Sequence, residues 1–206
     1  MKNKKFLSPF LAVSIFVVVL MLDLLTKEFI IKNLIPNVGD MVGVIPGFIN
    51  FVYVKNTGAA WGMLAGRPVF LIVLSLIVIG LLIAYYVLRL KKTDKHSSVW
   101  FGVSMGLIAG GCFGNLVDKI AFGYVRDFIN FEFISFPVFN FADVALTIGV
   151  ITMIIYFLFF YSKEEKLVKK DKEKGEFQTS ISLSTTPDLT PVDENKDNDG
   201  GDENER

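Results

Sequence analysis

The chain has 206 residues, 52% of them hydrophobic, with 20 phenylalanines and a mean hydropathy of +0.49. This composition is too apolar for an ordinary soluble domain and indicates an integral membrane protein. The formal net charge is zero, and the basic residues form short clusters beside apolar runs without a recognition motif, which excludes nucleic-acid binding. The single cysteine, Cys112, excludes an internal disulfide framework.

Four apolar segments predict membrane-spanning helices. The clearest is Val69–Leu88, which carries no charge and would form a helix about 30 Å long, enough to cross the hydrocarbon. The first segment follows three lysines, as the apolar region of a signal peptide would. No cleavage site with two small residues separated by one other residue follows it, so we interpret it as an uncleaved helix. The expected helices cover about residues 10–31, 69–89, 99–118 and 142–161.

The distribution of lysine and arginine predicts the orientation, because cytoplasmic loops are enriched in both. Basic residues are dense before the first helix, in Arg89–Lys95 and in Lys163–Lys174, and sparse in the two other connections. We therefore expect both termini in the cytoplasm and the connections 23–68 and 119–141 on the outer face. Residues 1–162 form the expected membrane domain, and 163–206 form a charged, disordered cytoplasmic tail.

Two local patterns refine the fold. Phe48–Val54 is rich in aromatic and β-branched residues after a Pro-Gly turn, which predicts a short β element on the outer surface, with Trp61 as an interfacial anchor. Asn56–Gly58 is typical of a tight turn. In the third helix, glycines at a spacing of four form one close-packing face. They are Gly102, Gly106, Gly110 and Gly114.

The stretch Gly110–Asp143 holds ionisable and amide side chains between two long apolar segments, and polar groups near lipid mark a functional-site candidate. If Tyr124–Phe133 is extended, alternation places Asp127 as the only charge on an apolar face, with Arg126 on the opposite face. Burial there would raise the pKa of Asp127. Asp143 would open the fourth helix, and the sequence does not decide which of the two aspartates holds a proton.

Two carboxylates that share one proton suit peptide hydrolysis, in which one activates water and the other donates a proton. The only histidine, His96, lies at the opposite membrane face, and there is no HExxH motif, so we expect neither a metal nor a cofactor. The simpler alternative makes Asp127 a solvated loop residue and Asp143 a helix N-terminal charge. Likewise, Asp23 and Lys27, four residues apart in the first helix, could simply pair with each other.

Two other functions fit intramembrane carboxylates. One is a small proton or ion transporter that uses them as relays. The other is a divalent-metal lipid phosphatase with Asp23, Asp118, Asp127 and Asp143 as oxygen ligands. Activity in EDTA would separate a peptidase from the metal enzyme.

Four motifs in matching order over residues 10–161 resemble lipoprotein signal peptidase, the type II signal peptidase of bacteria. They are KNTGAAWG at 55–62, GGCFGNLVDK at 110–119, VRDFINF at 125–131 and FPVFNFAD at 136–143. The resemblance implies a four-helix aspartyl endopeptidase of the bacterial inner membrane, with an outer β cradle. Its substrates would be diacylglyceryl-modified prolipoproteins, cut before the lipid-modified cysteine, and its partners would be these substrates and membrane lipids. We expect a monomer.

By the same resemblance, Asp127 and Asp143 are the expected catalytic pair, and Gly58–Gly62 would close over the substrate. The family usually has Arg where this chain has Lys119. A guanidinium group that can form two parallel hydrogen bonds is therefore replaced by an ammonium group that acts as a point charge. The expected supporting or substrate-binding residues are Asp23, Lys27, Asn56, Gly58, Asn115, Asp118, Lys119, Asn130 and Asn140.

Overall fold

The computed structural model describes residues 7–58, 64, 66–93 and 97–184. The chain divides into two units, Met1–Val168 and Lys169–Arg206, and the first contains all the elements of the candidate site. This boundary lies six residues after the one expected at 162. Trp61 and His96 lie outside the described residues.

Four helices are long and apolar enough to cross a membrane, which confirms the predicted multi-pass membrane fold. They are α1 (Leu7–Asn33), α2 (Pro68–Thr93), α3 (Val99–Phe122) and α4 (Phe141–Phe159). All but α4 extend past the expected ends, because their last turns are amphipathic and carry charges that a hydropathy pattern excludes. Helix α3 is central, since it packs against α1, α2 and α4 and is the most buried of the four.

The glycine face of α3 allows α1 to approach closely, as the spacing predicted. A Cβ atom on Gly102, Gly106 or Gly110 would overlap with Ser8, Ala12 or Val19 of α1 respectively. Gly114 meets the carboxylate of Asp23 in the same way. Without side chains between them, the helix backbones come into van der Waals contact, which is a main source of helix association in lipid.

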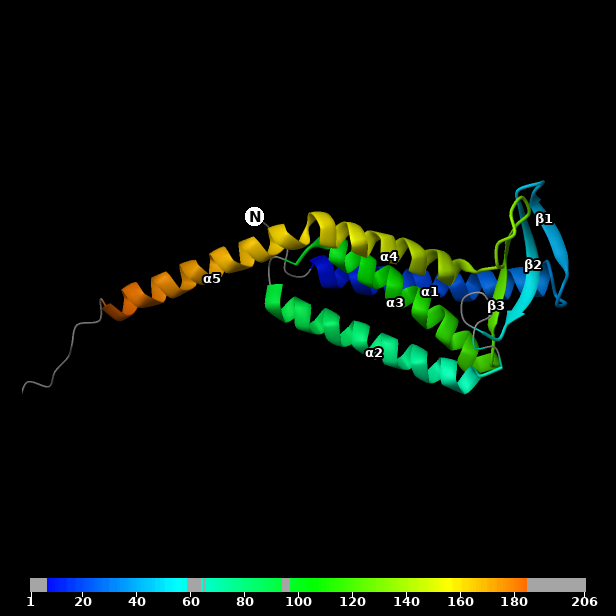
Figure 1. Cartoon of the computed structure of the whole chain (residues 1–206), viewed down its shortest axis with the longest axis horizontal. Coiled ribbons are helices and arrows are strands. Elements are labelled where there is room, and N and C mark those ends of the chain that lie inside the picture. The colour runs from blue at the N-terminus through cyan, green and yellow to red at the C-terminus, as the bar shows by residue number, and fades with distance from the viewer. Residues whose placement is uncertain (1–6, 59–63, 65, 94–96, 185–206) are drawn as a thin grey trace, which may run out of the picture. The chain divides into compact units, whose positions relative to one another are not determined.

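A three-stranded antiparallel sheet lies at one end of this bundle, with its strands running across the helix axes (Figure 1). Its strands are β1 (Met41–Ile45), β2 (Ile49–Asn56) and β3 (Val125–Phe131), in the order β1-β2-β3. The second and third match the predicted β element and the predicted extended segment. Strand β1 was not predicted, because all five of its residues are exposed and its apolar side chains do not alternate with polar ones.

Connectivity fixes the sheet against the helix ends. Helix α3 is capped by Gly123, whose left-handed φ of 79° suits a glycine and whose N–H donates to the carbonyl of Lys119 at 3.0 Å. Strand β3 begins two residues later, with Val54 of β2 opposite Asp127. An isolated bridge between Ile129 and Phe139 leads the chain back to the start of α4. The middle of β3 therefore lies where α3 ends and α4 begins.

After α4 the chain continues as helix α5 (Tyr161–Ser184). The first part of the expected disordered tail is therefore helical, and the helix is polar on most of its surface. The rest of the expected tail, residues 185–206, lies outside the described residues.

Gly106→Ala should destabilise the protein, because the added Cβ would lie 2.6 Å from the carbonyl oxygen of Ala12 and 2.9 Å from Cβ of Ile15. Overpacking of this kind costs about 1–3 kcal/mol in the free energy of unfolding. Gly80→Ala in α2 is the matched control, since nothing lies within 4 Å of its added Cβ. Thermal unfolding in detergent should show a lower midpoint for Gly106→Ala alone; equal midpoints would contradict the packing role of the glycine face.

Candidate active site

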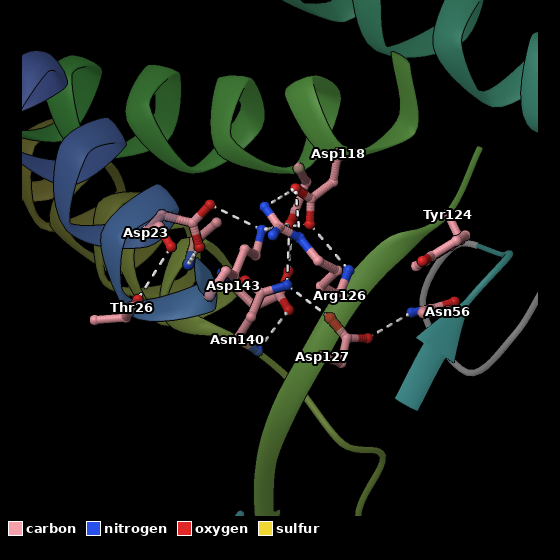
Figure 2. A network of polar contacts seen from close by, with 12 residues as sticks. Asp23, Thr26, Asn56, Asp118, Tyr124, Arg126, Asp127, Asn140 and Asp143 are labelled. Atoms are coloured by element: carbon pink, nitrogen blue, oxygen red, sulfur yellow. Dashed lines mark hydrogen bonds and ion pairs between the residues drawn. The ribbon is translucent and has the colours of Figure 1, made fainter. Parts of the chain in front are cut away.

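Asp127 lies in β3 and is 2% exposed, with both carboxylate oxygens held by amide groups (Figure 2). Its Oδ1 accepts a hydrogen bond from Nδ2 of Asn140 at 2.6 Å, and its Oδ2 accepts one from Nδ2 of Asn56 at 3.0 Å. The side chain is therefore fixed between the start of α4 and the end of β2. The neighbouring Arg126 does not contact it, as strand alternation predicted.

Asp143 lies in the first turn of α4 and is also bound by amides. Its Oδ1 accepts from Nδ2 of Asn115 at 2.7 Å, and its Oδ2 accepts from the backbone N–H of Asn140 at 3.1 Å. In return, Oδ1 of Asn140 accepts from the N–H of Asp143 at 3.0 Å, which completes a capping box. The helix N-terminus thus both positions this carboxylate and favours its negative charge.

Asn140 joins the two carboxylates. It is fully buried, and its amide group contacts Asp127 through nitrogen and the Asp143 backbone through oxygen. The same Nδ2 also donates to Oδ1 of Asn115 at 3.0 Å. Asp127 and Asp143, sixteen positions apart in the sequence, are therefore held on the two sides of one amide side chain.

The environment of Asp127 favours its protonated form. Burial and the negative charge of Asp143, in that order, raise its pKa to about 7 from the model-compound value of 3.8, against the opposing effect of the bonds from Asn56 and Asn140. This carboxyl group therefore keeps its proton to a much higher pH than an ordinary aspartate does. A group with this property is suited to proton transfer.

A second set of buried charges lies beside the pair and is neutralised internally. Nζ of Lys27 lies 2.8 Å from Oδ2 of Asp23 and 3.2 Å from Oδ2 of Asp118, and all three side chains are fully buried. Arg126 donates to Asp118 through Nε at 3.2 Å, Nη2 at 2.8 Å and its backbone N–H at 2.9 Å. Asp23 and Lys27 do pair along α1, as the simpler alternative held, but they also belong to this larger network.

This network fixes the elements that carry the aspartate pair. Oδ1 of Asp23 accepts the backbone N–H of Ala142 at 2.9 Å, which joins α1 to the first turn of α4. Arg126 joins β3 to α3 through Asp118 and to α1 through Glu28 at 3.1 Å. Each aspartate of the pair therefore follows a residue that is bound to a buried aspartate. Arg126, before Asp127, is bound to Asp118, and Ala142, before Asp143, is bound to Asp23.

A cavity of about 640 Å³ opens on the pair. Its polar wall contains Asn56, Gly58, Asn115, Lys119, Asp127 and Asp143. Its apolar wall comes from the segment around Phe131–Phe139 and from α4, including Val144 and Ile148. Ile148 is 49% exposed on the outer side of α4, so the cavity borders the surface that faces lipid.

Most of the predicted site residues meet here, in one of two groups. Asp127, Asp143, Asn56, Gly58, Asn115, Lys119 and Asn140 line or bound the cavity, and Asp23, Lys27 and Asp118 form the buried ionic network. Asn130 joins neither group, because its Nδ2 donates to Oδ1 of Asn50 across the sheet at 2.9 Å. The predicted turn is present, since Oδ1 of Asn56 accepts from the N–H of Gly58 at 3.0 Å; the remaining residues of the expected Gly58–Gly62 closure lie outside the described residues.

Sequence reasoning missed two contributors, Glu28 and the N–H of Ala142. Both act by joining elements that are distant in the sequence. Glu28 is an ordinary exposed helix residue by pattern, and it also pairs with Lys32. No spacing rule could have assigned either one to the site.

Comparison with known proteins decides the family. A family model described as signal peptidase (SPase) II matches residues 15–159. The chain belongs to the signal peptidase II family. It is therefore a peptidase, and its four apolar helices make it a multi-pass membrane protein.

Relatives and solved structures agree with this assignment. The lipoprotein signal peptidase of Staphylococcus carnosus is 39% identical over 161 residues, covering 77% of this chain and 96% of its own. That of Enterococcus faecalis is 34% identical over 151 residues, covering 73% and 87%. A bacterial membrane enzyme solved by the in meso method at 2.3 Å superposes with a TM-score of 0.64 at 35% identity, covering 71% of this chain and 87% of that one.

The fold should depend strongly on the buried ammonium group of Lys27. Lys27→Met would leave Asp23 and Asp118 without it, at a cost of about 3–5 kcal/mol in the free energy of unfolding. Lys32→Met is the matched control on the same helix, because Lys32 is 70% exposed in its pair with Glu28 and should contribute at most about 1 kcal/mol. Unfolding curves in detergent check both; a similar effect of the two substitutions would contradict the structural role of the network.

Proposed function

We propose that this chain is an aspartic endopeptidase that removes signal peptides from diacylglyceryl-modified prolipoproteins, cutting before the modified cysteine, with Asp127 and Asp143 as its catalytic residues. The observation that carries the catalytic assignment is the joining of both carboxylates to Asn140 beside a cavity. The lipoprotein signal peptidases similar to this chain support the substrate class. The transporter and lipid phosphatase alternatives are not favoured, because the family is one of peptidases.

In the proposed mechanism, one proton is shared by the pair and rests on Asp127. Asp143 is the base, because it accepts two hydrogen bonds at a helix N-terminus, where a negative charge is favoured. It takes a proton from water as the water oxygen attacks the scissile carbonyl carbon. Asp127 donates its proton to the carbonyl oxygen, which gives a gem-diol intermediate. As this intermediate collapses and the C–N bond breaks, Asp143 passes the proton it took from water to the leaving amine nitrogen. Asp127 then takes back a proton from a gem-diol hydroxyl, which restores the pair.

The cavity walls suggest how the substrate lies. The amides of Asn56 and Asn115 and the ammonium group of Lys119 flank the aspartates and can bind the polar backbone around the scissile bond. The apolar wall, which reaches the lipid-facing side of α4, suits the membrane-embedded part of the substrate. Lys119 forms no hydrogen bond or ion pair within the described part of the chain, which leaves its charge available to a substrate oxygen.

We further propose that the protein lies in the bacterial inner membrane with both termini in the cytoplasm and the site at the outer face. Arg89, Lys91 and Lys92 occur in the last turns of α2, at the end of the bundle opposite the sheet, and the lysine-rich start of α5 follows α4 at that same end (Figure 1). We also propose that the protein acts as a monomer. The tail after residue 162 takes no part in the chemistry.

Asp127→Asn and Asp143→Asn should each abolish cleavage, because a neutral amide can neither accept nor supply the proton. Both variants should remain folded, since the amide has the same shape as the carboxylate and its oxygen can keep one of the two accepted hydrogen bonds. The measurement is the mass of the product after incubation of purified protein with a diacylated prolipoprotein in EDTA, which would stop a divalent-metal enzyme.

Glu132→Gln is the control for these two substitutions. It also removes a carboxylate near the sheet, but its side chain bonds the N–H of Gly47, away from the cavity. It should cleave at the wild-type rate. Normal processing by either aspartate variant would remove that residue from the catalytic pair.

The pH profile should identify the residue that holds the proton. Because the pKa of Asp127 is raised to about 7, its acid form is present below that pH and lost above it. If Asp127 is the general acid, kcat/KM should fall about tenfold for each pH unit above the pKa. Asn56→Ala should move this fall to higher pH, because the bond from Asn56 lowers the pKa of Asp127. A rate that rises through pH 7 would instead make Asp127 the base.

A further inference from the structure

One end of the sheet carries a cluster of four exposed apolar side chains, three of which lie outside the cavity of the candidate site. Phe48 lies in the turn between β1 and β2, and Phe133, Ile134 and Phe136 follow β3. Their exposed fractions are 45%, 53%, 46% and 44%. The rings of Phe48 and Phe133 stack in parallel, with centroids 4.7 Å apart. We name these four residues the aromatic tip.

The position of the aromatic tip follows from the connectivity of β3. This strand begins three residues after the last residue of α3 and runs across the helix axes (Figure 1). Its far end, at Phe131, lies about 20 Å along the strand from Val125, at about 3.3 Å per residue. The aromatic tip therefore shares the depth of the helix ends but is displaced sideways from α3, and in Figure 1 this end of the sheet extends past α4.

Charge is almost absent from this surface. Met41–Ile49 contains no charged residue, and Phe131–Phe139 contains only Glu132. That carboxylate is occupied, since its Oε2 accepts from the N–H of Gly47 at 3.0 Å. A surface of this kind offers nothing to a charged partner and is suited to an apolar one.

We propose that the aromatic tip inserts into the bilayer beside α4, at the boundary between headgroups and acyl chains. The lipid-facing surface of α4 reaches the same depth in the membrane as the aromatic tip. The lipid that covers this surface of α4 therefore also reaches the aromatic tip. Apolar and aromatic side chains bind at this boundary by burying themselves about 5–10 Å into it. The far end of β3 is thereby supported by lipid, as its near end is supported by α3.

This contact also bears on the cavity. The ring of Phe131 lies 5.5 Å from that of Phe133 and 5.9 Å from that of Phe136, measured between centroids. Phe131 and Phe136 also line the cavity that opens on the aspartate pair. The bilayer therefore contacts Phe136, which is part of the cavity wall, and Phe133, whose ring lies against Phe131 in that wall. The inference depends on the membrane fold and not on the catalytic assignment.

The test places a reporter on the aromatic tip of the full chain. Phe133→Trp is made in a background in which the two native tryptophans are replaced, as Trp61→Phe and Trp100→Phe, and the protein is reconstituted into zwitterionic phosphatidylcholine vesicles. Fluorescence is quenched either by nitroxide-labelled lipid or by aqueous iodide. Val38→Trp is the matched control, because Val38 is 56% exposed and lies in the turn after α1. The next residue, Gly39, donates its N–H to the carbonyl of Tyr53 in the middle of β2, so this turn lies away from the Phe48 end of the strand.

Insertion predicts that nitroxide lipid quenches the tryptophan at position 133 at least about twofold more than the one at position 38, with the reverse order for iodide. Stronger quenching by iodide at position 133 would overturn the proposal. Protection of position 133 from both quenchers would also overturn it, because the aromatic tip would then be covered by protein, such as a second copy.

A second reporter avoids the preference of tryptophan for interfaces. Ile134→Cys in a Cys112→Ser background carries a nitroxide spin label, with Val38→Cys as its control. Collisions with oxygen should exceed those with a water-soluble nickel chelate at position 134 and not at position 38. None of these readouts requires peptidase activity, so failure of the proposed function and failure of this inference are distinguishable.

Discussion

The structure depends on how carboxylates are accommodated at the edge of a lipid bilayer, where an unpaired charge is costly. Four aspartates lie close together, and the protein treats them in two ways. Asp23 and Asp118 are held by Lys27 and Arg126, so their charges are neutralised inside the protein. Asp127 and Asp143 receive only neutral amide and backbone donors within the described residues. The first pair holds the helices and β3 together, and the second is left able to exchange a proton.

These two arrangements depend on each other. The charged form of a carboxylate whose pKa is raised to about 7 is less stabilised than that of a carboxylate in an ion pair. Contacts made by neighbouring residues must therefore fix its position. Arg126 provides one such contact, because it precedes Asp127 in β3 and binds Asp118 on the other side of the strand. Asp23 provides another by accepting the N–H of Ala142, one residue before Asp143. The charged network provides rigidity, and the proposed chemistry belongs to the amide-bound pair.

Much of this could be predicted from the sequence, for reasons that particular residues illustrate. The spans follow from apolar length, the glycine face from its spacing, and the orientation of Asp127 away from Arg126 from strand alternation. Strand β1 was missed because it is exposed on both faces and lacks the alternation that identifies a strand. Asn130 resembles Asn140 in sequence context, yet it pairs with Asn50 across the sheet, and only the strand register decides this. The link between Asp23 and Ala142 spans 119 positions, beyond any local pattern.

The capping of α4 has a consequence for biosynthesis. Asp143 and Asn140 come from the last membrane helix of the chain to be made, whereas their partners Asn115 and Asp127 come from segments made earlier. While the ribosome is still completing that helix, the nascent polypeptide has only half of the proposed catalytic pair and its partners. With this pair as the catalytic site, the protein could cut other proteins only after its own insertion is finished.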